Sequence, residues 1–216
     1  MTITLLLLYS FLWWQFLVIT TLSSGYHRYF SHQSFEAPTW YEYLVLLLGP
    51  LSGTGHAIGW AGVHRMHHAH SDTEQDPHSP IFQNFWRVLT STFTVDHLPS
   101  KYFKDLFKNK RVKFFYKYHI PIRLITFVLG FLLLPLFWFL ALICLPMFWG
   151  RLSFGVVNTI GHWYAEPRAS LLANILLGGE GDHKYHHENP GSFRISKYWD
   201  PAGWFISLIR LKPPVI

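Results

Sequence analysis

Residues 3–24 of the 216-residue chain are ITLLLLYSFLWWQFLVITTLSS. This stretch carries no charged side chain, and a helix that crosses a bilayer needs about 20 consecutive apolar residues. A second uncharged stretch runs for 27 residues, from Leu124 to Gly150. So short a chain could not bury both stretches in a soluble core. We therefore expect an all-α integral membrane protein.

Histidines gather directly after the first stretch and recur in two later runs. His27 and His32 come first, and the pattern His-x-x-His-His follows at 64–68 (HRMHH) and 183–187 (HKYHH). Positions i, i+3 and i+4 lie on one helix face, so each run is expected to offer three imidazoles to a common point. His27 and His32 are five residues apart, which predicts different ligand directions or a local helix break.

The histidines must all reach one side of the membrane to share a site, which restricts the topology. We expect about three transmembrane helices, one from the first stretch and a hairpin over about residues 119–160 that turns near 134–137. The apolar segment Tyr43 to Val63 is interrupted by glycines and a proline. It is expected to form an interfacial or shallow re-entrant element, because broken backbone at membrane depth needs protein or water partners.

Basic residues predict the orientation. Seven Lys and Arg side chains crowd between Lys101 and Lys117, and none precedes Arg28. The positive-inside rule therefore places a helical cap with the histidines in the cytoplasm. The basic cluster is either a solvated face near anionic headgroups or a docking surface for an acidic electron carrier or an anionic substrate head. We expect no nucleic-acid partner.

Eight clustered imidazoles exceed what one metal ion needs. Imidazole binds zinc, copper, iron and nickel, so the residue type does not name the metal. The His-Glu-x-x-His pattern of zinc peptidases is absent, and the single cysteine, Cys144, lies in an apolar run far from the histidines. We expect two metal ions, held by nitrogen with few or no carboxylate ligands.

These stretches resemble the three histidine boxes of membrane fatty acid desaturases. The boxes correspond to HRYFSH at 27–32, HRMHH at 64–68 and GEGDHKYHH at 179–187. Two smaller matches are the acidic stretch SDTEQDPH at 71–78 and NTIGH at 158–162, which resembles the family's Asn-Ser-x-x-His element. The pattern is most similar to that of stearoyl-CoA and acyl-lipid delta-9 desaturases, over about residues 4 to 210.

The resemblance implies one desaturase domain over residues 1–216, with a non-haem di-iron centre and O2 as co-substrate. The activity implied is the introduction of a cis double bond, at delta-9, into a fatty acyl chain. The implied iron ligands are His27, His32, His64, His67, His68, His162, His183, His186 and His187. Asn158 is expected to meet a metal-bound water. The family has two spans before its first box, so its first transmembrane helix is expected to be absent here.

The implied partners are membrane lipid, a fatty acyl substrate and an electron donor. The acyl group could be carried by CoA, a lipid or acyl carrier protein. The sequence contains no fused electron-transfer domain, so we expect a separate donor such as ferredoxin or cytochrome b5.

Other residues near the boxes have a functional and an ordinary interpretation. Metal-bound histidines usually donate their second ring nitrogen to a carboxylate or carbonyl, and the nearby carboxylates are either such acceptors or solvated charges. These are Asp72, Glu74, Asp76, Glu180, Asp182 and Glu188. His78 is a further candidate, whereas His56, His70, His97 and His119 are expected to be structural or surface residues. Arg151 could snorkel or pair in the site. The tryptophans, Trp13, Trp14, Trp60, Trp138, Trp149 and Trp163, either form an interfacial belt or line an acyl passage.

Two alternatives remain open from the residues alone. A di-iron membrane hydroxylase acting on alkyl, sterol or sphingolipid substrates would use the same oxidant. A membrane haem electron carrier would also use histidine pairs, but it leaves the adjacent pairs His67, His68 and His186, His187 unexplained.

Overall fold

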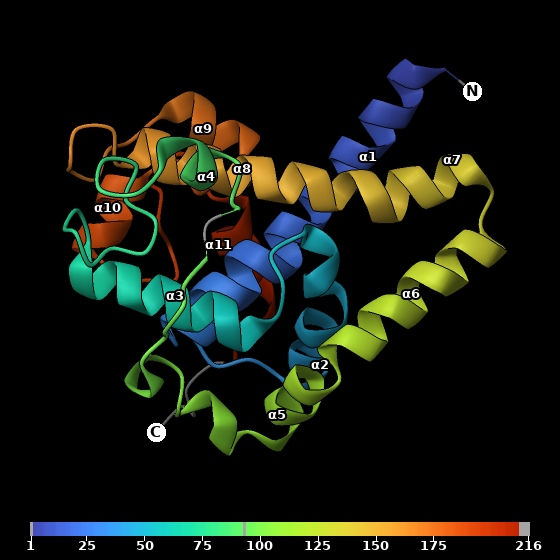
Figure 1. The fold of residues 1–216 in the computed structure, drawn as a ribbon, viewed down its shortest axis with the longest axis horizontal. Helices are drawn as coiled ribbons and strands as arrows, with labels where there is room; N and C mark the ends of the chain where they lie inside the picture. The colour runs from blue at the N-terminus through green and yellow to red at the C-terminus, as the bar shows by residue number, and fades with distance from the viewer. Residues whose placement is uncertain (1, 93, 212–216) are drawn as a thin grey trace.

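The computed structural model describes residues 2–92 and 94–211, and the regular elements in that part of the chain are all helices (Figure 1). The α-helices are α1 (Ile3–Leu17), α2 (Thr39–Leu48), α3 (Ala57–His70), α4 (Phe85–Leu89), α5 (Lys110–Lys117), α6 (His119–Leu133), α7 (Leu136–Phe139), α8 (Leu145–Gly161), α9 (Leu171–Leu176), α10 (His183–Glu188) and α11 (Pro201–Ile209). Two π-helical segments, η1 (Val18–Ser31) and η5 (Leu140–Cys144), and three short 3₁₀ segments, η2 (Gly49–Ser52), η3 (Ser100–Tyr102) and η4 (Leu106–Lys108), complete the set. The expected all-helical class is confirmed.

The first long helix joins α1 to η1 without a break. It runs for 29 residues, Ile3–Ser31, and is long and apolar enough to cross a membrane. In η1 the hydroxyl groups of Ser24 and Ser31 donate to the carbonyls five residues before them, each at 2.7 Å. These bonds span the wider π turn, in which hydrogen bonds run between residues five apart.

The second long helix joins α7, η5 and α8 over Leu136–Gly161. It is also long and apolar enough to cross a membrane. It starts after a break at Leu134 and Pro135, where the hairpin was expected to turn. Its α8 and η5 parts pack along α1 (Figure 1). Two indoles tie the helices together: Trp13 Nε1 donates to the Leu142 carbonyl and Trp149 Nε1 donates to Ser10 Oγ, each at 3.0 Å.

Two glycines on α8 let other segments approach its backbone. A Cβ at Gly150 would collide with the Ser52 carbonyl in η2, and a Cβ at Gly155 would collide with the Leu89 carbonyl in α4. A backbone carbonyl occupies the space that a side chain would need at each position. Any residue larger than glycine would therefore push the two segments apart. The glycines therefore fix where η2 and α4 lie beside α8.

Two bent helix pairs account for the other apolar segments. Residues Thr39–Ser52 and Ala57–His70 meet at 78°, and Lys110–Lys117 and His119–Leu133 meet at 62°. By length and composition the described residues hold two helices that could cross a membrane, or up to four if each bent pair is one span. The three expected spans fall within this range, and the expected interruption of Tyr43 to Val63 lies at Gly53 and Gly55, both with positive φ.

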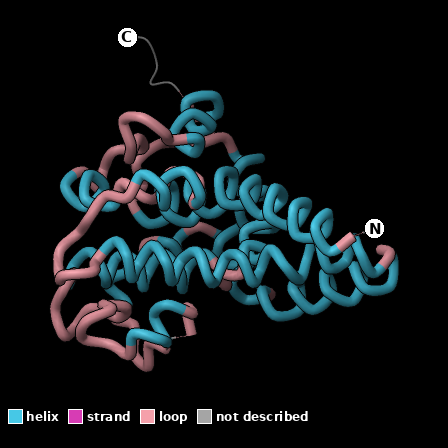
Figure 2. The backbone as a smooth tube through the Cα atoms, turned by 90° about the horizontal axis from the view of Figure 1, so that it is seen from above, coloured by secondary structure: helices cyan, strands magenta, loops and turns pink. Residues whose placement is uncertain are grey.

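The histidines lie at the end of the molecule away from the N-terminus. There α3, α10 and the ends of η1 and α8 converge, and Figure 2 shows most of the loops gathered at the same end. The adjoining apolar core contains Trp14, Leu22, Tyr26, Tyr41 and Val45, all almost fully buried. This core anchors η1, which carries the first box.

Candidate metal centre

The nine histidines expected to bind metal lie in two adjoining groups. One group contains His27, His32, His64, His68 and His186, and the other contains His67, His162, His183 and His187. Within each group the candidate ligand atoms lie within 4.8 Å of one another. Side chains from four separate parts of the chain thus meet in a single place.

The π-helical winding of η1 aligns the first box. The His32 N–H donates to the His27 carbonyl at 3.1 Å, an i to i+5 bond that puts the two residues one turn apart. Their ring centroids are 5.0 Å apart, and both rings belong to the first group. Of the two expected alternatives, different ligand directions are not found, whereas the α-helical winding is locally broken, as a π-helix.

The second and third boxes are each divided between the groups. On α3, His64 and His68 join the first group while His67 joins the second; on α10, His183 and His187 join the second while His186 joins the first. The expectation that each run serves one common point is wrong. Neighbouring α-helical residues diverge by about 100°, so an adjacent histidine pair faces two points, and two metals can share each helix.

The ring nitrogens of each group lie close enough together to bind a common metal ion. In the first group the Nε2 atoms of His27 and His186 are 3.0 Å apart, and those of His32 and His64 are 2.9 Å apart. In the second group the Nε2 atoms of His162 and His183 are 2.8 Å apart, and those of His67 and His187 are 3.2 Å apart. Two nitrogens bound to one metal ion at about 2.1 Å lie about 3.0–3.4 Å apart. The residues present therefore fit one metal ion in each group.

Carboxylates hold the other ring nitrogen of three of these histidines. His27 Nδ1 lies 2.8 Å from Glu180 Oε2, and His67 Nδ1 lies 2.9 Å from Asp76 Oδ2. His162 Nδ1 lies 3.0 Å from Asp72 Oδ1. A carboxylate at Nδ1 accepts a hydrogen bond from the Nδ1–H group and leaves the Nε2 lone pair of that histidine free to bind a metal.

The six carboxylates named from the sequence thus separate into two sets. Asp72, Asp76 and Glu180 contact the histidines, whereas Glu74 and Glu188 are exposed. Asp182 is half-buried and precedes α10, where its backbone carbonyl accepts the His186 N–H at 3.1 Å.

Burial keeps the third-box histidines neutral, the form that binds metals. It lowers the pKa of His183 and of His186 well below the ordinary value, and the pKa of His187 to about 2, with neighbouring imidazoles adding to the effect. Burial alone would raise the pKa of Glu180, but His27, Arg28 and Ser23 hold it at about 2. The site therefore combines neutral ligands with at least one fully ionised carboxylate behind them.

Two arginines that the sequence analysis did not single out brace the boxes. Arg28 is fully buried and its Nη1 donates to Asp200 Oδ1 at 2.7 Å, while its Nη2 lies 3.4 Å from Glu180 Oε1. Arg65 donates to the carbonyls of Phe30 and Ser31, at 2.7 and 2.8 Å, and so caps the end of η1. Each arginine directly follows the first histidine of its box. This shared position in the sequence could have indicated that the two arginines have similar roles.

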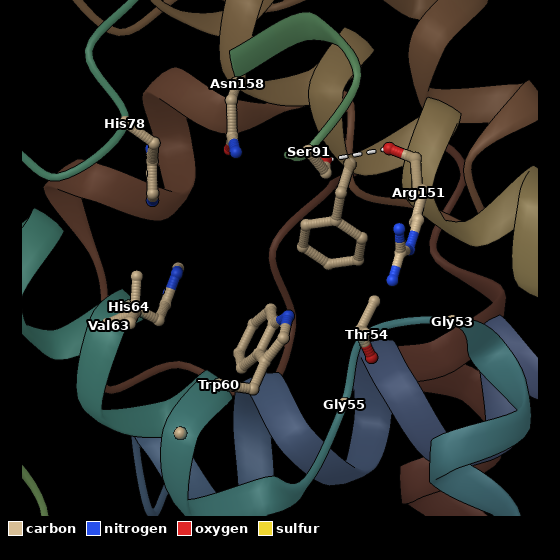
Figure 3. A pocket seen from close by; sticks show the side chains of 12 residues that line it. Gly53, Thr54, Gly55, Trp60, Val63, His64, His78, Ser91, Arg151 and Asn158 are labelled. Carbon is tan, nitrogen blue, oxygen red and sulfur yellow. Dashed lines mark hydrogen bonds between the residues drawn. The ribbon is translucent and has the colours of Figure 1, made fainter. Parts of the chain in front are cut away.

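Asn158 and His78 lie beside the two groups. Asn158 is buried on α8, one turn before His162, and its side chain points into a cavity that His64 and His78 also line (Figure 3). The His78 ring packs against that of His67 with centroids 4.2 Å apart, and with His67 and Asp76 it forms a further cluster of possible ligand atoms. Both residues therefore lie where the histidine groups border the cavity.

The remaining histidines of the described chain belong to neither group. His56 Nδ1 accepts the Gly59 N–H at the start of α3, and its ring packs on His119. His70 Nε2 lies 2.9 Å from the Tyr102 hydroxyl, and His97 is exposed. Of the six tryptophans considered, Trp60 lines the cavity and stacks on His64 at 4.9 Å.

A comparison with known protein families identifies the family of the chain. The sequence model of the family described as Fatty acid desaturase matches residues 4–198 of the chain. The chain belongs to the fatty acid desaturase family. This desaturase is therefore an oxidoreductase of lipid metabolism, and its histidine groups are the family's boxes brought together in space.

Curated relatives of the desaturase agree with this family. An sn-1 stearoyl-lipid 9-desaturase of Anabaena variabilis is 32% identical over 82% of the chain and 70% of its own length. An sn-2 palmitoyl-lipid 9-desaturase of a Nostoc species is 32% identical over 86% of the chain and 72% of its own length. An acyl-CoA Delta(11) desaturase of Trichoplusia ni is 31% identical over 82% of the chain and 56% of the relative. The relatives thus include acyl-lipid and acyl-CoA enzymes.

The geometry also disfavours a haem carrier. A haem places its two axial imidazoles on opposite faces of a flat macrocycle. Here the facing Nε2 atoms are about 3 Å apart, too close for a ring between them.

Proposed function

We propose that this desaturase is an O2-dependent di-iron enzyme that introduces a cis double bond, at delta-9, into a fatty acyl chain. The observation that carries the proposal is the division of nine histidines into groups of five and four, with the ligand atoms of each group within 4.8 Å of one another. One iron would be held by each group. Imidazole ligands are neutral, so the carboxylates Asp72, Asp76 and Glu180 would supply compensating charge from behind.

The reaction removes one hydrogen from each of two adjacent methylenes that no neighbouring carbonyl acidifies. Side-chain acids and bases cannot do this, and the bound irons would supply the oxidising chemistry with O2. O2 accepts four electrons, two from the broken C–H bonds and two from an external donor, and with two further protons it leaves as two waters. The electron count therefore requires a separate donor.

Asn158 is proposed to orient a water on the metals. Its amide is buried, faces the cavity and lies beside His64 and His78 (Figure 3). An amide can hold a water by hydrogen bonds without adding charge to the site. This would leave the charge of the centre to the irons and the carboxylates.

The substrate is proposed to be an acyl chain carried by a lipid, by CoA or by acyl carrier protein. The names of the Anabaena and Nostoc relatives specify lipid-linked chains and position 9, whereas that of the Trichoplusia relative specifies CoA and position 11. Position 9 is proposed here because the names of the Anabaena and Nostoc relatives specify it, and the chain covers at least 70% of the length of each.

The electron donor is proposed to dock on the lysines of residues 101–117. Six lysines there are exposed, whereas Arg111 in the same segment is bound to Glu42 at 2.7 Å. An exposed basic surface attracts an acidic carrier such as ferredoxin or cytochrome b5 over a distance set by ionic strength. Electron transfer should therefore slow as salt is added.

The histidine end is proposed to face the cytoplasm. The basic residues lie on that side of the first span, in agreement with the positive-inside rule. A tag at the N-terminus should then be protected from a cytoplasmic protease. A tag at the C-terminus should be cut by it. If both tags are cut, the number of crossings is even and the three-span topology is wrong.

The experiment that tests the activity is the fatty acid profile of cells that express the chain. We expect new monounsaturated chains with the double bond mapped to position 9, and about two irons per purified chain. His64→Ala and His186→Ala should abolish the product, whereas His97→Ala, which changes an exposed histidine, should not. Hydroxylated chains without double bonds would favour the hydroxylase instead.

A further inference from the structure

The two histidine groups differ in the charges that lie behind them. One carboxylate, Glu180, lies behind a ligand of the first group, whereas two, Asp72 and Asp76, lie behind ligands of the second group. A carboxylate that is hydrogen-bonded to a metal-bound imidazole makes that imidazole a stronger electron donor. The number of these carboxylates and the partners that neutralise them therefore bear on the oxidation state that each metal ion prefers.

A buried arginine faces the carboxylate of the first group. Arg28 Nη2 lies 3.4 Å from Glu180 Oε1, and Arg28 Nη1 donates to Asp200 Oδ1 at 2.7 Å. Arg28 and Asp200 are almost fully buried, so little water screens their charges. Asp200 caps α11 and accepts the Gly203 N–H at 2.8 Å, so the partial positive charge of that helix end offsets its own. Arg28 is thus fixed where it can neutralise Glu180.

A second arginine lies beside the first group. Arg65 donates to the carbonyl of Ser31, directly before His32, at 2.8 Å. Its Nη1 pairs with Asp105 at 2.7 Å, but the Asp105 side chain is 37% exposed, against 17% for Arg65. Water therefore screens the charge of this carboxylate more than that of the arginine. The first group thus has two arginines near its ligands.

The carboxylates of the second group have no such cation. Among the described residues no Lys or Arg nitrogen lies within 4.0 Å of Asp72 or Asp76. Asp72 Oδ2 accepts a hydrogen bond from Ser71 Oγ, a neutral donor, at 3.1 Å. Burial raises the pKa of Asp76 to about 7, so a cation at the second group is what would keep Asp76 ionised. The negative charge behind the second group is therefore not neutralised by an arginine or a lysine.

We propose that Arg28, by neutralising Glu180, raises the reduction potential of the metal ion in the first group above that in the second, so that the first group takes up the first electron. Negative charge near a metal stabilises its higher oxidation state, and a nearby cation opposes this effect. The donor loses one electron, one ferric ion becomes ferrous, and the other stays ferric. This inference rests on the proposed di-iron function and adds an order of reduction to it. Arg28 is a positioning residue, because it acts through Glu180 and His27.

The first group also adjoins the proposed docking surface of the donor. Tyr102 and Asp105 belong to the lysine-rich segment 101–117, and both contact Arg65, through the Tyr102 carbonyl at 3.0 Å and the Asp105 carboxylate at 2.7 Å. Arg65 in turn contacts the residue before His32, a half-buried member of the first group. Charge and position therefore favour the same group as the first acceptor.

The half-reduced protein tests the inference without turnover. Purified iron-loaded protein in detergent is reduced stepwise with dithionite and mediators, without oxygen or acyl substrate, and followed by electron paramagnetic resonance and Mössbauer spectroscopy. We expect a form with one ferric and one ferrous site to be the main species at half reduction. Direct passage from the fully oxidised to the fully reduced centre would overturn the inference.

Two isosteric variants identify which site is ferrous. Glu180→Gln, studied at saturating iron, should alter the ferrous part of the half-reduced spectrum and move the two potentials further apart. Asp72→Asn keeps an acceptor for His162 Nδ1–H, and it should alter the ferric part and bring the potentials closer. Residue 72 has a φ of 60°, a conformation in which asparagine is common. Loss of structure alone would not shift the separation in opposite directions. The reverse assignment of the two sites would overturn the inference.

Variants of Arg28 assign the difference to this residue. Arg28→Gln leaves the charge of Glu180 unbalanced, so the separation of the potentials should shrink, and Arg28→Lys should restore most of it. Asp72→Asn leaves the buried arginine in place and tests the same difference independently of whether these two variants fold. Glu74→Gln removes an exposed carboxylate and should leave both potentials unchanged. An unchanged separation in Arg28→Gln would contradict the assignment.

The order of reduction and the desaturase function fail differently. A centre in which the first group is reduced first, in a protein that forms no double bonds, would reject the desaturation alone. An active desaturase in which the second group is reduced first would reject the order of reduction alone.

Discussion

At the scale of single residues, the site depends on what lies behind the ligands. Each imidazole has two nitrogens, and here Nε2 faces a neighbouring ligand while Nδ1 of His27, His67 and His162 faces a carboxylate. The carboxylate fixes the tautomer and therefore decides which nitrogen can bind a metal. The histidines alone do not define the centre.

The Glu180 carboxylate provides a test of this dependence. Glu180→Gln removes the charge that faces His27 Nδ1 at 2.8 Å, so metal affinity should fall roughly ten- to hundredfold while the protein still folds. The measurement is iron content against a graded chelator. Glu188→Gln changes an exposed carboxylate directly after the same box and should match the unaltered protein. Equal iron retention in both variants would mean that Glu180 is a structural partner of Arg28 only.

Asn158 separates water orientation from metal binding. Asn158→Ala should keep its iron and lose roughly ten- to hundredfold in desaturation rate, because only a hydrogen-bonding partner is removed. Asn158→Asp should also change the optical spectrum of the iron, since a carboxylate can bind it directly. Asn189→Ala, at an exposed position, is the control. Normal turnover in Asn158→Ala would make the amide an ordinary helix-end group.

At the scale of elements, the winding of each helix determines which group a histidine joins. The sequence was enough to find eight of the nine histidines, because clustered imidazoles are rare and their spacing is regular, whereas His162 was indicated by the resemblance to the family. It was not enough to place His27 with His32, since nothing in the spacing itself signals a π-helix. The division of His67 from His68 follows from the 100° step of an α-helix and could have been predicted.

The cavity could not be predicted, because it depends on how closely distant segments approach. Gly155 fixes α4 against α8 through the Leu89 carbonyl, and Ser91 after α4 lines the cavity. No local pattern links residues 89 and 155. Arg151 stood out as a charge in an apolar run, but its place in the cavity wall was visible only in the structure.

Gly155→Ala tests this packing. Alanine favours the helix by up to about 1 kcal/mol, but the new Cβ meets the Leu89 carbonyl, and such overpacking costs about 1–3 kcal/mol. The melting temperature in detergent should therefore fall. Gly191→Ala, where a Cβ meets nothing within 4 Å, is the control. A melting temperature equal to or above that of the unaltered protein would show that α4 can yield at this contact.

At the scale of the whole molecule, one end is suited to lipid and the other to metals. The faces of α1 and α6 expose leucine, isoleucine and phenylalanine side chains that a bilayer would cover, whereas the opposite end buries histidines. Stability should accordingly depend on two separate conditions, the surrounding amphiphile and the protonation state of the histidines.

Acid should destabilise the metal-free protein. The folded state lowers the pKa of His78 to about 3 and of His187 to about 2, mainly by burial, while the unfolded chain has the ordinary value of about 6.5. Below pH 6.5 the unfolded state therefore binds more protons, and the free energy of unfolding falls with pH. At pH 5.5 each such group costs about 1 kcal/mol.

Melting temperatures of the metal-free protein at pH 7.5 and 5.5 measure this effect. The fall on acidification should be unchanged in His97→Gln, because that exposed side chain protonates in both states. A melting temperature independent of pH in this interval would show that the histidines stay accessible to protons in the folded protein.

The interleaving of the boxes also restricts the order in which a cell can make this enzyme. The first group needs His186, and the second needs His183 and His187. The first group is therefore complete only when the ribosome has synthesised residue 186 of 216, and the second only at residue 187. By then the first long helix, Ile3–Ser31, has left the ribosome and can have entered the bilayer. The proposed irons would therefore bind after that helix has inserted, and a nascent chain arrested before residue 183 would present at most four histidines of the first group and two of the second.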